Sequence, residues 1–191
     1  MYQGRSSPVD GGTINWATPN QMYQGIDGEM ETLLGEMEAG SVGSLVISGV
    51  NPVYEYYNGE RFGKALSKVK LTVSLNDRLD ETSDLCKYVV PSHHFLESWG
   101  DAEPKAGYFS MMQPTINPLF HTRQFQESLL KWASNPTSYH DYFKAAWVSK
   151  LGSVEAYNKA LQDGVVENTT VTAAGAAFNG AAVAAAVSAV A

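Results

Sequence analysis

Three short β-branched runs lie between residues 44 and 90, and a polar, turn-forming cluster follows each of them. The runs predict strands at 44–50, 71–75 and 88–90. The first strand must end at Asn51-Pro52, because proline lacks the amide hydrogen that a ladder bond needs. Runs of this kind are typical of a parallel sheet buried on both faces, with a binding crevice at the carboxyl ends of its strands.

Helical patterns separate these runs. Apolar residues at helical spacing predict helices at 26–38 and 61–69, and Asp80 is a suitable N-cap for a short helix at 81–86. The alternation of helix and strand predicts an α/β fold. In this fold a Rossmann-like parallel sheet with right-handed crossovers is flanked by helices.

The composition and spacing of residues change after Pro91. Residues 92–121 mix aromatic residues with prolines and glycines at irregular spacing, which predicts a long functional or interface loop. Three helices are predicted beyond it, at 122–133 with Thr122 as cap, at 138–150, and at 154–162 before Gly164. The predicted organisation is a loop at 1–25, an α/β domain with its extended loop at 26–121, a helical annex at 122–164, and an Ala- and Thr-rich segment at 165–191 that stops within an element.

Composition narrows the classes of partner. The chain has 191 residues and is 44% hydrophobic, enough for one domain with a small annex. Its net charge of −7 argues against nucleic acid and against anionic membrane surfaces. The single cysteine, Cys86, excludes an internal disulfide and an iron–sulfur cluster held by this chain alone, and we expect it to be buried. The alanine-rich stretch at 173–191 is too weakly hydrophobic to predict a membrane span.

The polar residues that follow the strands are the candidate binding residues. The turn at 49–52 lets the backbone approach a ligand closely, because it combines Gly49 with Asn51-Pro52. Asp80 and Glu81 are suited to capping a helix, and Asp80 is also suited to facing a ligand at the end of its strand. His93, His94 and Glu97 fit a zinc site only with a further ligand from elsewhere, and otherwise line a crevice. We assign no catalytic residue and no metal ligand.

Four motifs, taken in chain order, resemble the molybdopterin oxidoreductase superfamily. They are Gly49-Val50-Asn51-Pro52, Asp80-Glu81-Thr82, Val89-Val90-Pro91 and Glu97-Ser98-Trp99-Gly100. The longer stretches 91–105 and 113–124 resemble one branch of that superfamily, the large molybdopterin-like, iron–sulfur subunit of alternative complex III. That complex is a membrane-bound quinol oxidoreductase. The resemblance covers about residues 26–165.

This resemblance implies that the chain is part of a subunit of a respiratory quinol-oxidising complex at the periplasmic face of the inner membrane. Its partners are then the remaining domains of the parent chain and the other subunits. The resemblance also implies a set of residues that line a cofactor crevice: Asn51, Pro52, Asp80, Glu81, Thr82, His94 and Glu97.

The cofactor itself is not expected in this chain. Cofactor-bearing members of the superfamily have threonine after the Glu-x-x-Gly motif, whereas here Asp101 follows Gly100. This departure suits the alternative-complex branch, whose molybdopterin-like domain lacks the cofactor. The resemblance therefore implies a scaffold without a redox centre of its own, with iron–sulfur clusters elsewhere in the parent protein.

Two alternatives remain open from the sequence. The first is a fragment of an active molybdoenzyme that does contact molybdopterin guanine dinucleotide. The second is a free-standing, flavodoxin-like module that binds a small ligand at Asn51 and Asp80.

Overall fold

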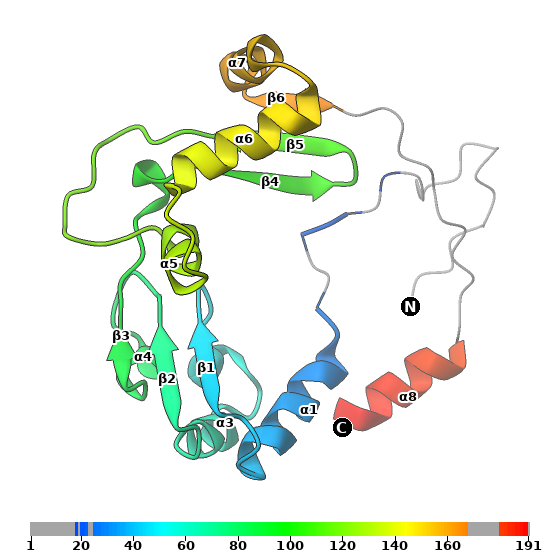
Figure 1. Cartoon of the computed structure of the whole chain (residues 1–191). Coiled ribbons are helices and arrows are strands. Elements are labelled where there is room, and N and C mark those ends of the chain that lie inside the picture. Colours follow the sequence, from blue (N-terminus) through cyan, green and yellow to red (C-terminus); the bar gives the residue numbers. More distant parts are fainter. Residues whose placement is uncertain (1–17, 19, 23–24, 168–179, 191) are drawn as a thin grey trace. The chain divides into compact units, whose positions relative to one another are not determined.

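The computed structural model describes residues 18, 20–22, 25–167 and 180–190 (Figure 1). The helices are α1 (Asp27–Glu38), α2 (Pro52–Glu55), α3 (Gly59–Leu66), α4 (Glu81–Asp84), η1 (Phe95–Glu97, 3-10), α5 (Phe125–Trp132), α6 (Tyr139–Leu151), α7 (Val154–Asp163) and α8 (Gly180–Val190). The strands are β1 (Ser44–Ile47), β2 (Leu71–Ser74), β3 (Tyr88–Val89), β4 (Gly100–Lys105), β5 (Tyr108–Met112) and β6 (Val165–Glu167). Most of the predicted loop at 1–25 and the Ala- and Thr-rich stretch at 168–179 lie outside the described residues.

The chain divides into two compact units, which we describe separately. The parallel-sheet unit takes in residues 26–99 and 113–146. The antiparallel-sheet unit takes in residues 100–112 and described residues before 26 and after 146.

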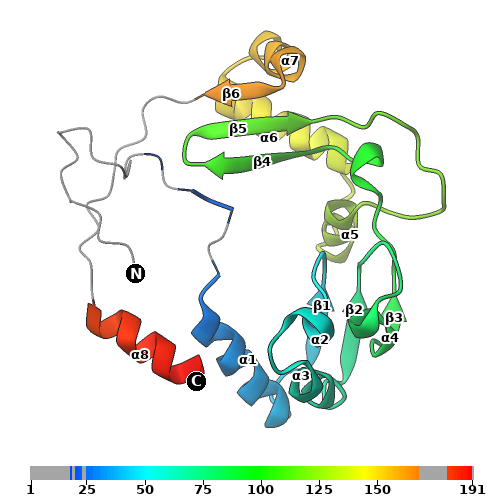
Figure 2. The same cartoon turned by 180° about the vertical axis from the view of Figure 1, so that it is seen from behind.

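The predicted α/β fold with its parallel sheet is confirmed. β1 pairs with β2 and β2 with β3, all in the same direction, so that the sheet order is β1-β2-β3 (Figures 1 and 2). The first strand is shorter than predicted and ends at Ile47, because Gly49 adopts a φ of 70° that turns the backbone away from the sheet. The short helix α2, which was not predicted, follows with Pro52 at its first turn.

The core of this unit lies between α1, α3 and β1. Leu34 and Met37 of α1 are fully buried against Ile47 of β1 and against Phe62 and Leu66 of α3. The predicted apolar face of the 61–69 helix is therefore confirmed. Ile26, which the periodicity places on the inner face of the first helix, is 63% exposed, because α1 begins only at Asp27.

The prediction of a buried sheet is confirmed for the central strand β2, where the consecutive residues Thr72, Val73 and Ser74 are all buried although successive side chains point to opposite faces. The edges of the sheet are less covered. Val46 of β1 is 44% exposed, Leu71 of β2 is 42% exposed, and Val89 of β3 is 37% exposed. The exposed side chains therefore lie on the two edge strands and at the first residue of the central strand.

The prediction of one long loop at 92–121 is wrong in part, because η1 and the antiparallel hairpin of β4 and β5 lie within it. β4 pairs with β5, and β5 pairs with β6, to give the order β4-β5-β6. The polar sequence of β4 lacks alternation and contains Pro104, so no local period marks it as a strand. It pairs with the next strand, β5, across the two residues Ala106 and Gly107, and β5 pairs on its other side with β6, which follows more than 50 residues later.

Aromatic contacts hold the antiparallel-sheet unit together. The ring of Trp147, at the carboxyl half of α6, meets Phe109 of β5 edge-on with centroids 5.4 Å apart. Its indole Nε1 donates to Asp101 Oδ2 at 2.7 Å. Gly164 ends α7 in the left-handed conformation, as predicted, and its carbonyl accepts from Met111 N.

The structure differs from the predictions for Thr122 and Cys86. Thr122 does not cap the helix that follows it. α5 begins at Phe125, and the Thr122 hydroxyl pairs with His93 Nδ1 at 2.6 Å. Cys86 is half-buried rather than fully buried, and desolvation raises the pKa of its thiol. Over the described ranges, no helix has both the length and the apolar character needed to cross a membrane.

Candidate functional site

The carboxyl ends of all three parallel strands meet at one rim, where a cleft of about 550 Å³ opens. The turn after β1 contributes Gly49 and Asn51, and the segment after β2 contributes Asn76 and Asp80. The segment after β3 contributes His93 and His94, among others. Parallel sheets bind ligands at this edge because crossover connections leave it open. The cleft is therefore the candidate site of the parallel-sheet unit.

Asn51 is engaged by its own neighbours rather than pointing freely into the cleft. Its amide nitrogen donates to Glu81 Oε2 at 2.7 Å, and its amide oxygen accepts from the hydroxyl of Thr82 at 2.6 Å and from Thr82 N at 3.2 Å. Thr82 Oγ1 in turn accepts from Val53 N at 3.0 Å. These bonds tie the start of α2 to the start of α4. Pro52 and Thr82 are buried and Glu81 does not line the cleft.

Asn76 is the central residue of the rim, and sequence reasoning missed it. Its Oδ1 accepts from Gly49 N at 2.7 Å, and its Nδ2 donates to Val50 O at 3.0 Å and to Asp80 Oδ2 at 2.7 Å. One buried side chain thus fixes the turn after β1 relative to the N-cap of α4. A signal was present, since an asparagine directly after a β-branched strand is well suited to satisfying turn backbone groups.

Asp80 caps α4, as predicted. Its Oδ1 accepts from Ser83 N at 2.7 Å, and its Oδ2 accepts from Asn76. Desolvation by itself raises the pKa of this carboxyl, but the hydrogen bonds from Ser83 and Asn76 outweigh it and hold the pKa below its ordinary value. Asp80 is therefore ionised at neutral pH, with both oxygens already hydrogen-bonded.

The structure separates the residues of the His-His…Glu segment. His94 lines the cleft and forms a capping box at the start of η1, in which its ring Nδ1 accepts from Leu96 N and its backbone N–H donates to Glu97 Oε2. Glu97 is buried and does not line the cleft, and its Oε1 accepts from Leu119 N at 2.9 Å. His93 lies 3.9 Å from Glu97. Glu97 is thus a structural anchor for the loop after β5.

The anchoring role of Glu97 predicts a dependence of stability on pH. The backbone bond from Leu119 is the largest effect that holds the pKa of Glu97 below its ordinary value. A lowered pKa in the folded state means that the stabilisation is complete above the unfolded value of about 4.3 and is lost as pH falls through the folded value. Hydrogen exchange should therefore show the Leu119 amide losing protection as pH falls below the unfolded value and through the lower folded value. Glu97→Gln should weaken this protection at pH 7 and remove most of its pH dependence. Protection that is equal in both proteins at every pH would contradict the anchor.

The side chains present show whether this unit suits a metal ion or a phosphate group. Among the residues that the structure describes, no three His, Cys, Asp or Glu side chains come together as a metal site. The cleft also suits a pyrophosphate poorly, because Glu55, Asp77 and Asp80 line it and Arg78, its one lysine or arginine, is paired with Asp77. The N–H groups of Thr82 and Ser83 at the start of α4 already donate to Asn51 and Asp80. The residues therefore do not fit the phosphates of a dinucleotide cofactor.

Comparison with known proteins supports the fold. No protein-family model matches the chain, and no curated protein sequence matches it. Among solved structures, acetylene hydratase from Pelobacter acetylenicus, a molybdopterin enzyme, matches with a TM-score of 0.55 and 14% sequence identity. The match covers 73% of this chain and 20% of that one. The chain thus resembles part of a larger molybdoenzyme fold and spans about a fifth of the length of this structure.

Proposed function

We propose that this chain forms part of a molybdopterin-oxidoreductase-like subunit of a respiratory, quinol-oxidising electron-transfer complex. Within that subunit it acts as a scaffold of the cofactor domain and carries no redox centre of its own. Its partners are the remaining domains of the parent chain and other subunits at the periplasmic face of the inner membrane. The fold match supports the domain type, and the sequence motifs support the particular complex.

One observation carries the scaffold role: the polar side chains of the rim are bonded to one another. Asn51 is bonded to Glu81 and Thr82, while Asp80 is bonded to Ser83 and Asn76. A site built to hold a ligand presents some polar groups without internal partners, so that the ligand can satisfy them. Here the bonds run within the protein and fix the turns of the sheet. This arrangement supports the proposal that the polar residues of the crevice stabilise the fold.

A second candidate function is contact with a bound molybdopterin guanine dinucleotide. The open cleft of about 550 Å³ and the exposed His94 at its edge favour this alternative. The cofactor would supply redox chemistry that no side chain described here provides. Because the rim does not fit the phosphates of this cofactor, the side chains left to contact it are His93, His94 and Arg78, and Arg78 must first be released from Asp77.

Cofactor analysis of the native protein separates the two functions. We expect molybdenum by mass spectrometry, and pterin by fluorescence after oxidation, to be far below one per chain. The control is a molybdoenzyme of known content carried through the same purification. Stoichiometric molybdenum and pterin would contradict the scaffold role, and a lower content in the Arg78→Ala protein would then place the cofactor in this cleft.

A further inference from the structure

A second cavity of the parallel-sheet unit is lined by residues of η1, of the loop after β5 and of the start of α6. Its volume is about 430 Å³, which is within the range of cavities that hold small ligands. Of the described residues, only His93 lines both this cavity and the rim cleft. We call it the aromatic cavity, because Trp99, Tyr139 and His140 contribute to its walls.

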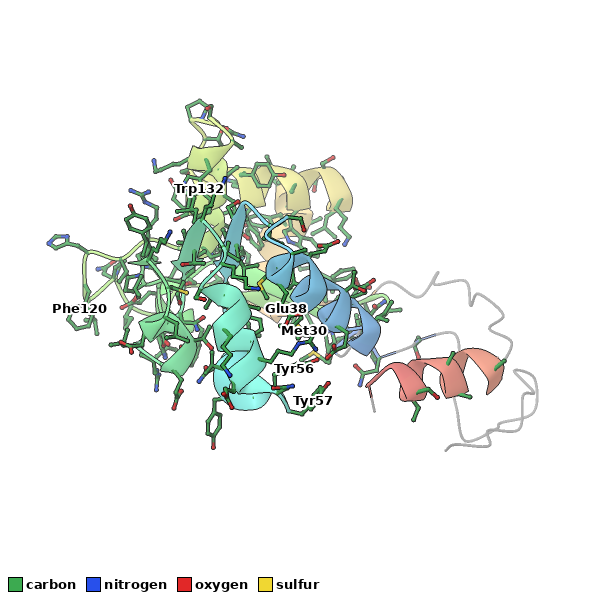
Figure 3. All side chains as sticks on the ribbon, turned by 90° about the horizontal axis from the view of Figure 1, so that it is seen from below. Met30, Glu38, Tyr56, Tyr57, Phe120 and Trp132 are labelled. Atoms are coloured by element: carbon green, nitrogen blue, oxygen red, sulfur yellow. The ribbon has the colours of Figure 1, made fainter. Side chains whose placement is uncertain are left out.

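Ring contacts and backbone hydrogen bonds hold the walls of the aromatic cavity in place. The ring of Trp99 stacks on that of His140, with centroids 4.5 Å apart and an interplanar angle of 36°. Ile116, on the loop after β5, lines the cavity, and its backbone N–H donates to Leu96 O at 3.1 Å. Phe120 of the same loop is 77% exposed and lies at the outer edge of the unit (Figure 3). The cavity therefore combines a stacked pair of rings with an apolar wall that the backbone holds.

Arg123 lines the cavity between two anchored residues. Before it, the hydroxyl of Thr122 pairs with His93 Nδ1 at 2.6 Å. After it, Gln124 Oε1 accepts from Trp99 N at 3.3 Å, and Gln124 Nε2 donates to Trp99 O at 2.5 Å. Within the part of the chain that the structure describes, the guanidinium of Arg123 has no hydrogen bond or ion pair. The backbone at this arginine is thus fixed, while its side-chain N–H donors remain available.

Neither carboxylate that lines the cavity pairs with this guanidinium. Both oxygens of Glu97 accept from backbone N–H groups. Glu127 Oε2 accepts from Tyr139 N at 2.6 Å, and the ammonium of Lys131 lies 3.6 Å from Glu127 Oε1. Among the described residues, Arg123 is therefore the charged side chain of the cavity that is left for a ligand.

We propose that the aromatic cavity binds an aromatic monocarboxylate. The carboxylate pairs with the guanidinium of Arg123, whose planar fork matches two carboxylate oxygens. The ring of the ligand packs against the stacked rings of Trp99 and His140, since aromatic rings favour offset and edge-to-face contacts with one another. A neutral ligand leaves Arg123 unpaired, and an aliphatic ligand leaves the ring wall uncovered. The site is independent of the proposed respiratory function.

Calorimetry on the full chain with three small probes tests the site. Benzoate has both the ring and the charge, benzamide is its neutral analogue, and acetate has the charge without the ring. We expect benzoate to bind with a dissociation constant of about 1 mM or lower, and each of the other probes to bind at least about tenfold more weakly.

Variants separate the two parts of the site. Arg123→Gln should weaken benzoate binding at least about tenfold and leave benzamide binding unchanged, because it removes only the charged contact. Arg123→Lys keeps the charge and should bind benzoate more tightly than Arg123→Gln does. His140→Ala should weaken binding of both ring-containing probes a few-fold. Arg78→Gln is the matched control and should bind benzoate as the original chain does, because Arg78 is equally exposed but lines the rim cleft. Circular dichroism checks that every variant folds.

Three results would overturn the proposal. The first is the absence of saturable benzoate binding to the original chain. The second is equal affinity for benzoate and benzamide, which would show that the guanidinium takes no part. The third is an equal loss of benzoate binding in Arg123→Gln and Arg78→Gln, which would mean that the carboxylate does not bind in the aromatic cavity.

Discussion

Asn76→Ala should lower the free energy of unfolding by about 3 kcal/mol. The side chain is buried and bonds to three groups, Gly49 N, Val50 O and the carboxylate of Asp80. Alanine leaves these groups without their partner in a site that water reaches poorly, and each unsatisfied polar group costs about 1–3 kcal/mol. Urea unfolding followed by far-ultraviolet circular dichroism measures the change.

Two further variants test the reason for this effect. Asn117→Ala removes an exposed asparagine of the same unit, and we expect it to change stability by less than about 0.5 kcal/mol. Asn76→Asp should destabilise the protein at pH 7 more than alanine does, because it brings a second carboxylate next to Asp80. Like charges this close raise the pKa of one of the pair, so this variant should regain stability as pH falls through that raised value. If alanine and aspartate variants respond identically to pH, the proposed contact with Asp80 is wrong.

The second large effect is expected for Gly59→Ala, which should destabilise the protein by about 3 kcal/mol or more. Gly59 is the first residue of α3, and a Cβ added to it lies 1.9 Å from the backbone oxygen of Val53 in α2. A backbone atom cannot swing aside as a side chain can, so α2 and α3 must move apart. The same movement disturbs Phe62, which is buried in the core one turn later.

Gly35→Ala is the matched control for this prediction. Gly35 lies inside α1, and a Cβ there meets nothing within 4 Å. Alanine is favoured over glycine in a helix interior, so this variant should gain about 0.5–1 kcal/mol. Thermal and urea unfolding of both variants give the comparison. A Gly59→Ala protein as stable as the original would show that α2 and α3 do not pack as closely as described.

Both predictions concern the segment between β1 and α4, on which the candidate site depends. The hydrogen bonds of Asn76 and Asn51 hold the rim, and the close approach at Gly59 holds α2 against α3. Loss of either should alter the rim cleft without touching the antiparallel-sheet unit. Hydrogen exchange of β1 and β2 should therefore rise in both variants, while that of β5 stays unchanged.

The sequence by itself determined the elements whose signals are local. Apolar spacing specified α1 and α3, β-branched runs specified β1, β2 and β3, and Asp80 and Gly164 marked helix ends through caps that involve residues only a few positions away. The parallel direction of the strands was predictable, because a helix that connects two neighbouring strands of one sheet forms a crossover between parallel strands. The convergence of Asn51, Asp80 and His94 on one rim was predictable for the same reason.

Only the tertiary structure decided the features that depend on distant partners. β5 pairs on one side with β6, which lies more than 50 residues further along the chain. Glu97 follows the strands as His94 does, yet it turns away to bind Leu119, which lies 22 residues further along the chain. Asn76 became the centre of the rim because the folded chain brings Gly49 and Val50 to it across 26 residues or more. Hydrogen bonds between such distant residues leave no period in the sequence, so only the folded chain reveals them.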